Sequence, residues 1–231
     1  METSLTVENY LKAIYRITAE RDKPAATGEV AAAVAVSPGA ATSMLKSLTE
    51  MGLATHARYE GVTLTDKGAA VALGIIRRHR LIELFLHRTL GLSWDEVHEE
   101  AEHMEHAVSD RLVDRIEAYL GYPKLDPHGD PIPSAEGVVA SLDYAALADA
   151  ERGATVRIVR VSDQSADFLR FLADRGVALN AVCEVVDRQP AADMLELRVG
   201  GQTVTLGLEA ARLLQVTPVS RETATISSAD I

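Results

Sequence analysis

The sequence has 231 residues and a mass of 24.8 kDa, which suits one large domain or two to three small ones. Its hydrophobic fraction of 47% and charged fraction of 25% are ordinary for a globular protein, and no apolar run approaches the roughly 20 residues that span a bilayer. The single cysteine, Cys183, excludes an intrachain disulfide and a cysteine-based zinc cage. The acidic N-terminus lacks the apolar core of a secretory signal, so we expect a cytoplasmic protein with no membrane partner.

The charge is distributed unevenly along the chain. The formal net charge is −11, yet residues 1–80 hold ten Lys/Arg against eight Asp/Glu, whereas residues 81–231 hold thirteen against twenty-six. Anion binding is therefore expected in the first part of the chain and cation binding behind it.

Residues 1–65 are predicted to form three short helices and a β-hairpin. The expected helices span about 6–19, 27–34 and 38–51, and the expected strands span 53–58 and 62–65. Ser37 is placed to cap the third helix, and Pro38 occupies its first position. This order of elements is the signature of a winged helix-turn-helix.

In a winged helix-turn-helix the third helix lies in the DNA major groove with its N-terminal end near the base edges. The start of this helix is small and uncharged, so the backbone can approach DNA closely, and its free amides can hold a phosphate. The helix carries no Arg, Asn or Gln, so readout would rest on small side chains and DNA shape. The expected DNA-contacting residues are Thr27, Ser37, Pro38, Gly39, Thr42, Ser43, Lys46, Arg58 and Tyr59. A winged fold used for protein contacts is the alternative.

Residues 66–120 are predicted to form two long helices. One spans 66 to about 90, and a capping box from Ser93 to Glu96 opens a second helix that runs to Leu120. The second helix has a narrow apolar stripe that needs a partner helix from the same chain or a second copy. The stripe consists of Val97, Ala101, Met104, Val108, Leu112 and Ile116.

The remainder of the chain is predicted to be an irregular connection followed by a small β-barrel. Residues 121–137 hold four of the eight prolines. The expected strands span 155–161, 182–187, 194–199 and 203–206, with one short helix over 165–175.

Histidine and glutamate side chains gather on the two predicted helices of residues 66–120. His79 and Glu83 are four residues apart and share a helix face, and a second shared face holds His98, Glu102, Glu105 and His106, with Glu99 beside it. Six carboxylates lie between Asp95 and His106 and repel one another unless a positive charge sits among them. A divalent cation supplies that charge, and imidazole with carboxylate suits manganese, iron(II), cobalt or zinc.

The alternative for this run is a solvated acidic helix face. The other histidines carry no such pattern: His103 is expected at the surface, and His56, His87 and His128 are interpreted as ordinary.

Motifs along nearly the whole chain resemble the DtxR/MntR family of metal-dependent bacterial transcriptional regulators. They are Glu8-Asn9-Tyr10-Leu11-Lys12-Ala13-Ile14-Tyr15, Val36-Ser37-Pro38, Leu64-Thr65-Asp66-Lys67-Gly68, Arg78-His79-Arg80-Leu81, Val97-His98-Glu99-Glu100-Ala101-Glu102-His103-Met104-Glu105-His106 and Asp126-Pro127-His128-Gly129-Asp130-Pro131-Ile132-Pro133.

The resemblance implies a mainly α fold with small β parts. It implies a winged helix-turn-helix over 1–65, a helical metal-binding and dimerisation domain over 66–137, and an SH3-like β-barrel over 150–220. It further implies a homodimer that binds a palindromic operator in double-stranded DNA and represses metal-uptake genes in metal homeostasis.

The resemblance also implies two neighbouring metal sites. Asn9, Glu102, Glu105 and His106 correspond to one site. His79, Glu83 and His98 correspond to the other, with Gln164 and Asp167 as further ligands from the third domain. In manganese regulators of the short two-domain type, His79 instead joins the main site and the carboxylates bridge a second metal.

The metal expected from the resemblance is Mn²⁺, with Fe²⁺ second and Co²⁺, Cd²⁺ or Zn²⁺ as surrogates. Iron-type members carry Cys at the position of Glu102, whereas manganese-type members carry Glu, a harder oxygen ligand. Asn9 departs from the usual Asp or Met, because its amide offers an oxygen without a negative charge.

Two other function classes share some of these features. A ferritin-like di-metal enzyme needs two Glu-x-x-His elements, and the only one here, Glu100 to His103, has its His off the metal face. A regulator with an organic ligand in the C-terminal barrel could use the Cys183 thiol, although a lone strand cysteine is commonly a packing residue.

Overall fold

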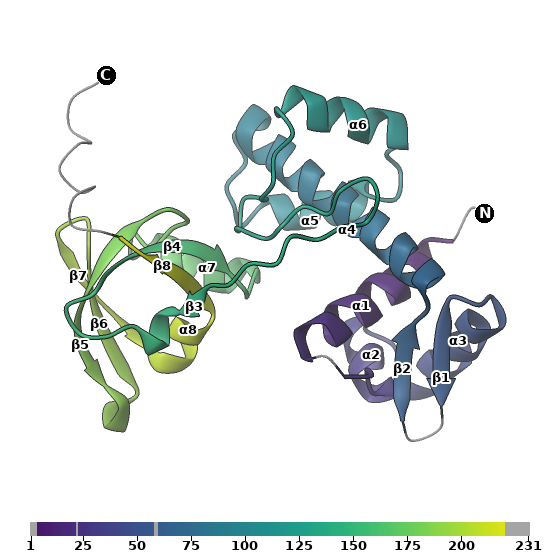
Figure 1. The fold of residues 1–231 in the computed structure, drawn as a ribbon, viewed down its shortest axis with the longest axis horizontal. Coiled ribbons are helices and arrows are strands. Elements are labelled where there is room, and N and C mark those ends of the chain that lie inside the picture. Colours follow the sequence, from purple (N-terminus) through teal and green to yellow (C-terminus); the bar gives the residue numbers. More distant parts are fainter. Residues whose placement is uncertain (1–3, 22, 58–59, 220–231) are drawn as a thin grey trace. The chain divides into compact units, whose positions relative to one another are not determined.

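The computed structural model describes residues 4–21, 23–57 and 60–219, which fold into two compact units (Figure 1). The first unit comprises the chain up to Ile82 together with Glu102–Tyr119 and Ile132–Val139. The second comprises Glu83–Ala101, Leu120–Pro131 and the chain from Ala140 onward. The predicted fold class, mainly α with small β parts, is confirmed.

The first unit begins with the predicted winged helix-turn-helix. Its elements are α1 (Leu5–Arg21), α2 (Thr27–Ala33), α3 (Pro38–Glu50), β1 (Ala54–Ala57) and β2 (Gly61–Leu64). The Ser37 hydroxyl accepts a hydrogen bond from the Ala40 amide at 3.3 Å, as expected for the cap of α3. β1 and β2 pair antiparallel as a short hairpin.

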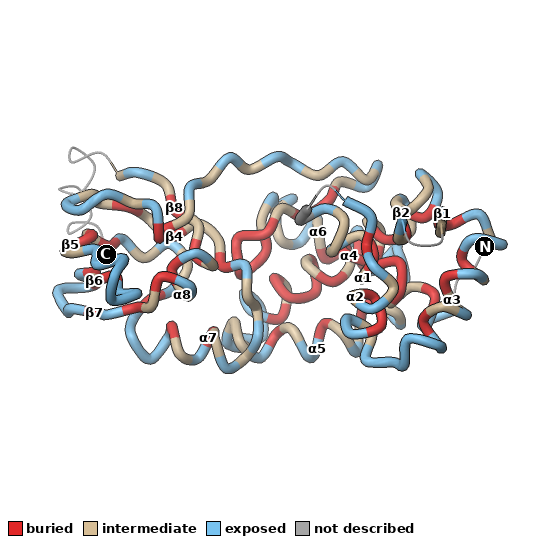
Figure 2. The backbone as a smooth tube through the Cα atoms, turned by 90° about the horizontal axis from the view of Figure 1, so that it is seen from below, coloured by how far each residue is buried: buried red, intermediate tan, exposed pale blue. Residues whose placement is uncertain are grey.

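The core of this segment is mainly aliphatic and joins α1, α3 and β2. Leu11 and Ile14 of α1 pack with Leu45 and Leu48 of α3 and with Val62 of β2, and all five are fully buried. Figure 2 shows buried residues recurring along α1. Burial of each such side chain stabilises the fold by about 1.5–3 kcal/mol.

The first long helix forms nearly as predicted. α4 (Asp66–Phe85) continues into η1 (Leu86–Leu90), a π-helical turn that the sequence pattern did not indicate. The helical run ends at Gly91, whose φ of 74° lies in the left-handed region that glycine adopts without strain.

The prediction of a second long helix is wrong. The capping contact forms, with the Ser93 amide donating to Glu96 Oε2 at 2.8 Å, but the helix is broken into α5 (Val97–Met104) and α6 (Asp110–Tyr119). Ser109 starts α6 by accepting hydrogen bonds from the Leu112 and Val113 amides. After the break, Val113 is buried instead of Leu112, which is 49% exposed. The predicted apolar stripe is therefore not continuous.

The second unit contains a six-stranded antiparallel sheet in the order β3-β8-β4-β5-β6-β7. The predicted strands appear as β4 (Thr155–Val161), β5 (Val182–Gln189), β6 (Met194–Val199) and β7 (Gln202–Gly207), and the predicted helix appears as α7 (Ala166–Ala173). The pattern missed β3 (Ala145–Ala146), η2 (Leu147–Asp149), η3 (Pro190–Ala192), α8 (Leu208–Arg212) and β8 (Leu214–Pro218). Register shifts in β4 and β5 let this small sheet curve around one aliphatic core.

None of the helices that the structure describes is long and apolar enough to cross a membrane.

Substitution of Gly68 tests the close packing of α4 against the winged segment, which comprises α1 to β2. A Cβ at this position would lie 1.9 Å from the carbonyl oxygen of Leu53, a backbone atom that has no room to move aside. Gly68→Ala is therefore expected to lower the free energy of unfolding by about 2 kcal/mol or more, measured by urea denaturation.

Gly74→Ala on the same helix is the matched control, because nothing lies within 4 Å of its Cβ position. Higher helix propensity should raise the stability of this variant by up to about 1 kcal/mol. Equal effects of the two substitutions would contradict the close approach at Gly68.

Candidate metal centre

Side chains from α1, α4 and α5 converge around one buried carboxylate of the first unit. Glu105 lies in the turn after α5 and is fully buried. His79 of α4 places Nδ1 at 2.5 Å from Glu105 Oε2 and at 3.9 Å from Glu102 Oε1. His79, Glu102 and Glu105 each offer a ligand atom, and these atoms lie within 4.8 Å of one another.

Lys12 of α1 reaches into this cluster. Its Nζ lies 2.6 Å from Glu102 Oε1, 2.8 Å from Glu105 Oε2 and 3.3 Å from His79 Nδ1. The spacing of these carboxylates predicts a positive charge among them, which a divalent cation would supply. The structure places an ammonium group there.

His106 is oriented by a carboxylate of α1. Its Nδ1 lies 2.6 Å from Glu8 Oε2, and because a carboxylate accepts hydrogen bonds only, Nδ1 carries the proton. In the neutral ring the lone pair then resides on Nε2, which is buried and has no hydrogen-bond partner among the described residues. Nε2 lies 3.3 Å from Glu105 Oε1, so it is directed at the cluster as a metal ligand requires.

Asn9 supplies a second acceptor atom of the same kind. Its Oδ1 is buried without a hydrogen-bond partner in the part of the chain that the structure describes. Asn9 and Glu102 line one cavity of about 520 Å³. The donor set fits a divalent transition metal, because it contains two carboxylates, two imidazoles and an amide oxygen. Asn9 Oδ1 and His106 Nε2 also lack the hydrogen bonds that buried polar atoms normally make.

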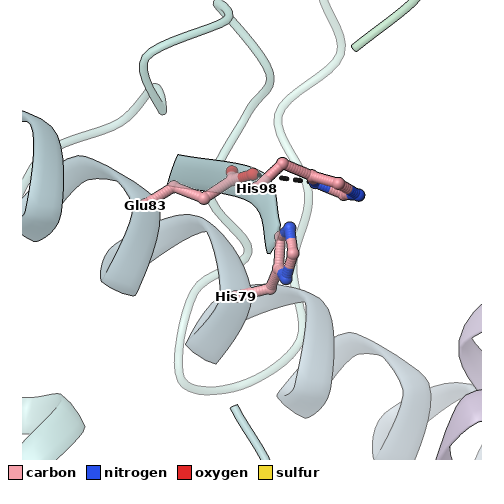
Figure 3. Close-up of side chains that lie close together, drawn as sticks. All are labelled: His79, Glu83 and His98. Carbon is pink, nitrogen blue, oxygen red and sulfur yellow. Dashed lines mark hydrogen bonds and ion pairs between the residues drawn. The ribbon is translucent and has the colours of Figure 1, made fainter. Parts of the chain in front are cut away.

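A second group of side chains belongs to the second unit. His98 of α5 places Nδ1 at 3.1 Å from Glu83 Oε1. Figure 3 shows this contact as a dashed line and shows His79 one turn before Glu83 on α4. Glu83 is fully buried, as is His128, whose Nδ1 lies 3.9 Å from Glu83 Oε2.

The tautomer of His128 follows from its contacts. Its Nε2 lies 2.8 Å from the carbonyl oxygen of Trp94, which can only accept, so Nε2 carries the proton and Nδ1 carries the lone pair. Burial lowers the pKa of His128, and the nearby Glu83 carboxylate opposes that shift. A neutral imidazole with its lone pair toward a buried carboxylate is a donor arrangement suited to a cation.

The loop that carries His128 is built by Asp126. Asp126 Oδ1 accepts hydrogen bonds from the amides of His128 and Asp130 at 2.8 and 2.9 Å. Gly129 has a φ of 88°, and a Cβ there would lie 2.0 Å from the Val159 carbonyl oxygen of β4. Ligand atoms of Glu83, Asp126 and His128 lie within 4.8 Å of one another, which makes a second candidate site.

Three predicted ligands join neither group among the residues that the structure describes. Glu99 is exposed. Gln164 donates its Nε2–H to Asp130 Oδ2 at 2.8 Å. Asp167 is 96% exposed and pairs with Arg170.

Sequence reasoning missed four residues of the two groups. These residues are Lys12, Glu8, Asp126 and His128, and the last had been interpreted as ordinary. The Lys12 signal lay in its spacing of three residues from Asn9 on one helix face. The His128 signal lay in the motif Asp126 to Pro133, whose polar residues were read only as part of a connection.

The predicted DNA-contacting residues lie at the exposed start and outer face of α3. Ser37, Pro38 and Gly39 are exposed, as are Ser43 and Lys46, and a Cβ at Gly39 would meet open space. Thr27 and Thr42 are half-buried, whereas Arg58 and Tyr59 lie outside the described residues.

Comparison with known proteins identifies the family. A model of the iron-dependent repressor N-terminal DNA-binding domain matches residues 2–62, and one of the iron-dependent repressor metal-binding and dimerisation domain matches 65–134. A FeoA domain model matches residues 145–218. The iron-dependent repressor IdeR of Mycobacterium leprae is 31% identical over 93% of this chain and 97% of its own length.

The chain belongs to the DtxR/MntR family of metal-dependent DNA-binding repressors.

The relatives of this repressor differ in the metal that their names carry. The HTH-type transcriptional regulator MntR of Bacillus subtilis is 31% identical over 54% of this chain and 86% of its own length. A solved structure described as a manganese-dependent transcriptional repressor in complex with manganese is 41% identical. The match covers 92% of this chain and all of that chain, with a TM-score of 0.83. The matched domains are those of a repressor, so the enzyme alternative is set aside.

Glu8 tests the orientation of His106 in the repressor. Glu8→Gln keeps the size of the side chain but removes the charge that holds the Nδ1–H tautomer. Loss of such an outer partner typically weakens metal binding by about 10- to 100-fold, and we expect a Kd for Mn²⁺ raised within that range in calorimetric titration. Glu29→Gln, on α2, is the control, and equal effects of both variants would contradict the role of Glu8.

Cys183 tests the thiol alternative. Cys183 is buried among the aliphatic residues of the sheet, and burial raises the pKa of its thiol to about 11. Because the thiolate is the reactive form, the folded repressor at pH 8 should resist a thiol-labelling reagent, whereas the urea-unfolded chain should react at once. Rapid labelling of the folded chain would restore Cys183 as a candidate functional thiol.

Proposed function

We propose that this repressor binds its operator when a divalent transition metal occupies the cluster around Glu105. The observation that supports this is the convergence of ligand types from two parts of one unit. Asn9 lies on the first helix of the winged segment, while Glu102, Glu105 and His106 lie at the end of α5 and in the turn that follows.

The proposed main site consists of Asn9, His79, Glu102, Glu105 and His106. The position of His79 Nδ1, near Glu105, supports the arrangement in which His79 joins this site. The proposed second site consists of Glu83, Asp126 and His128, with His98 beside Glu83. Glu99, Gln164 and Asp167 remain predicted ligands without support from the described contacts.

Mn²⁺ is the proposed metal, with Fe²⁺ second and Co²⁺, Cd²⁺ or Zn²⁺ as surrogates. Every proposed ligand of the main site is an oxygen or an imidazole nitrogen, and thiolate is absent from that set. Such ligands suit a hard ion such as Mn²⁺. At sites with softer ligands, Mn²⁺ competes poorly with other divalent metals. The similar solved structure described as manganese-dependent supports the same order.

Asn9 would hold the metal from α1, and Glu102 and Glu105 would hold it from the end of α5 and the turn that follows. A bound divalent ion would supply the positive charge that offsets the two carboxylates. The ligands on α1 and at the end of α5 would then hold the winged segment in one position. Affinity for the operator would rise only if that position makes better contacts with DNA than the metal-free position does.

We propose that a homodimer presents two α3 helices to a palindromic operator. The helices must lie about 34 Å, one DNA turn, apart or a multiple of it. The expected contacts come from the exposed residues of α3 named above, together with Thr27, Arg58 and Tyr59. In the alternative, in which the winged segment contacts another protein, the exposed Gly39 and Lys46 would not contact DNA.

The division into 1–65, 66–137 and 150–220 is proposed as the functional domain organisation. Repression of metal-uptake genes, a role in metal homeostasis, and action in the cytoplasm without a membrane partner are part of the same proposal. The buried Cys183 is compatible with a reducing compartment. An organic ligand in the C-terminal sheet domain would have to enter a core of packed aliphatic residues, so metal control is favoured.

Removal of a central ligand tests the proposal. Glu105→Gln and His106→Ala are each expected to abolish Mn²⁺-stimulated operator binding in a gel-shift titration while the dimer persists in size-exclusion chromatography. The matched controls are Glu100→Gln and His103→Ala, because both side chains are exposed on the neighbouring α5.

Two outcomes contradict the proposal. If the wild-type protein binds its operator equally well with Mn²⁺ and with a chelator, metal does not control it. If Glu105→Gln dissociates the dimer, the cluster is a structural element of the fold.

A further inference from the structure

We propose that Lys12 sets the metal affinity of the main site, because its ammonium group competes with the divalent ion for the same carboxylate oxygens. This inference rests on the proposed function and adds a determinant that the metal ligands do not include.

The contacts of Lys12 are those of an ion held in a site rather than of a surface lysine. Its Nζ contacts three carboxylate oxygens at 2.6, 2.8 and 2.9 Å, one from Glu102 and two from Glu105. The Lys12 side chain is only 8% exposed, and the Glu105 side chain is fully buried. A buried carboxylate is costly unless paired, so Lys12 stabilises Glu105 in this arrangement.

A metal ion and this ammonium group cannot share the site. A protonated lysine offers three donors and no lone pair, so Lys12 cannot itself be a ligand. A divalent ion bound by Glu102 and Glu105 would take the oxygens that Nζ contacts and would place two positive charges side by side. Binding of the metal therefore requires that Lys12 leave.

The structure provides space for that movement. Lys12 lines the cavity of about 520 Å³ that Asn9, Arg16 and Glu102 also line. The flexible four-carbon stem of lysine can turn its ammonium group toward this cavity without a change in the backbone of α1.

Lys12 and Asn9 act as alternatives on one helix face. They are three residues apart on α1, so both project toward the end of α5. Lys12 links α1 to Glu102 and Glu105 through an ion pair, and Asn9 links the same parts through the metal. The exchange of one link for the other sets the metal concentration at which the repressor responds.

Lys12→Met tests the competition, because methionine keeps the length of the stem and removes the charge. With the competing cation gone, the Kd for Mn²⁺ in calorimetric titration is expected to fall by about tenfold or more. Lys67→Met is the matched control: the same substitution removes one positive charge from an exposed position in the first turn of α4, away from that cavity, and screening should keep its Kd within about twofold of wild type. A Kd in Lys12→Met that is unchanged or higher overturns the proposal.

Lysine labelling provides a second readout in the wild-type dimer. Mn²⁺ should increase the modification of Lys12 by an acylating reagent several-fold, measured by mass spectrometry, because the displaced ammonium enters the cavity. Lys67, exposed in the first turn of α4, is the internal reference. Decreased or unchanged labelling of Lys12 with bound Mn²⁺ overturns the proposal even if Lys12→Met fails to fold.

The outcomes separate this inference from the proposed function. If Glu105→Gln binds Mn²⁺ as the wild type does, the metal centre itself is misassigned and both proposals fall. If Glu105→Gln loses Mn²⁺ binding while Lys12→Met keeps the wild-type Kd, only the competition by Lys12 is overturned.

Discussion

Neutralisation of the buried Glu105 carboxylate is the constraint on which the first unit depends. A carboxylate with no exposed surface needs a partner charge and hydrogen bonds, and its contacts come from two different parts of the unit: the Lys12 ammonium of α1 and the His79 imidazole of α4. Every cation that satisfies Glu105 through α1 therefore also fixes the winged segment against the helical segment. The regulatory proposal follows from this geometry, because the choice of cation decides which residue of α1 forms the link.

The long helix α4 supplies acidic and basic groups to two separate sites. His79 faces Glu105, and Glu83, one turn later, is paired with His98 and lies near His128. His128 is held by a loop that is determined by local chemistry: Asp126 accepts two backbone amides, and Gly129 adopts a φ that other residues avoid. The second site thus depends on a connection with no regular secondary structure, in which polar side chains replace the hydrogen bonds of a helix or strand.

The choice of metal and the choice of operator rest on different kinds of residues. In the proposed main site, metal preference depends on the chemistry of the ligand atoms, where Glu102 would supply a charged oxygen and Asn9 a neutral one. In the proposed function, operator preference depends on α3, whose exposed start carries small side chains that would allow close approach of the backbone to DNA. The proposed metal ligands and the proposed DNA-contacting residues have no member in common. The metal can therefore act on DNA binding only through the position of the winged segment, so that the two sites are coupled.

The sequence by itself determined the elements of the winged helix-turn-helix, the cap at Ser37, four of the six strands of the large sheet and the types of residue that gather around Glu105, because these depend on local spacing and on motifs. The tertiary structure alone decided where the charges meet. It broke the predicted second long helix between Met104 and Asp110, which a spacing pattern does not report when both halves bury one face. It placed the Lys12 ammonium among carboxylates some 90 residues away along the chain and buried His128 beside Glu83. Such contacts arise from packing between distant segments, which periodicity in one segment does not encode.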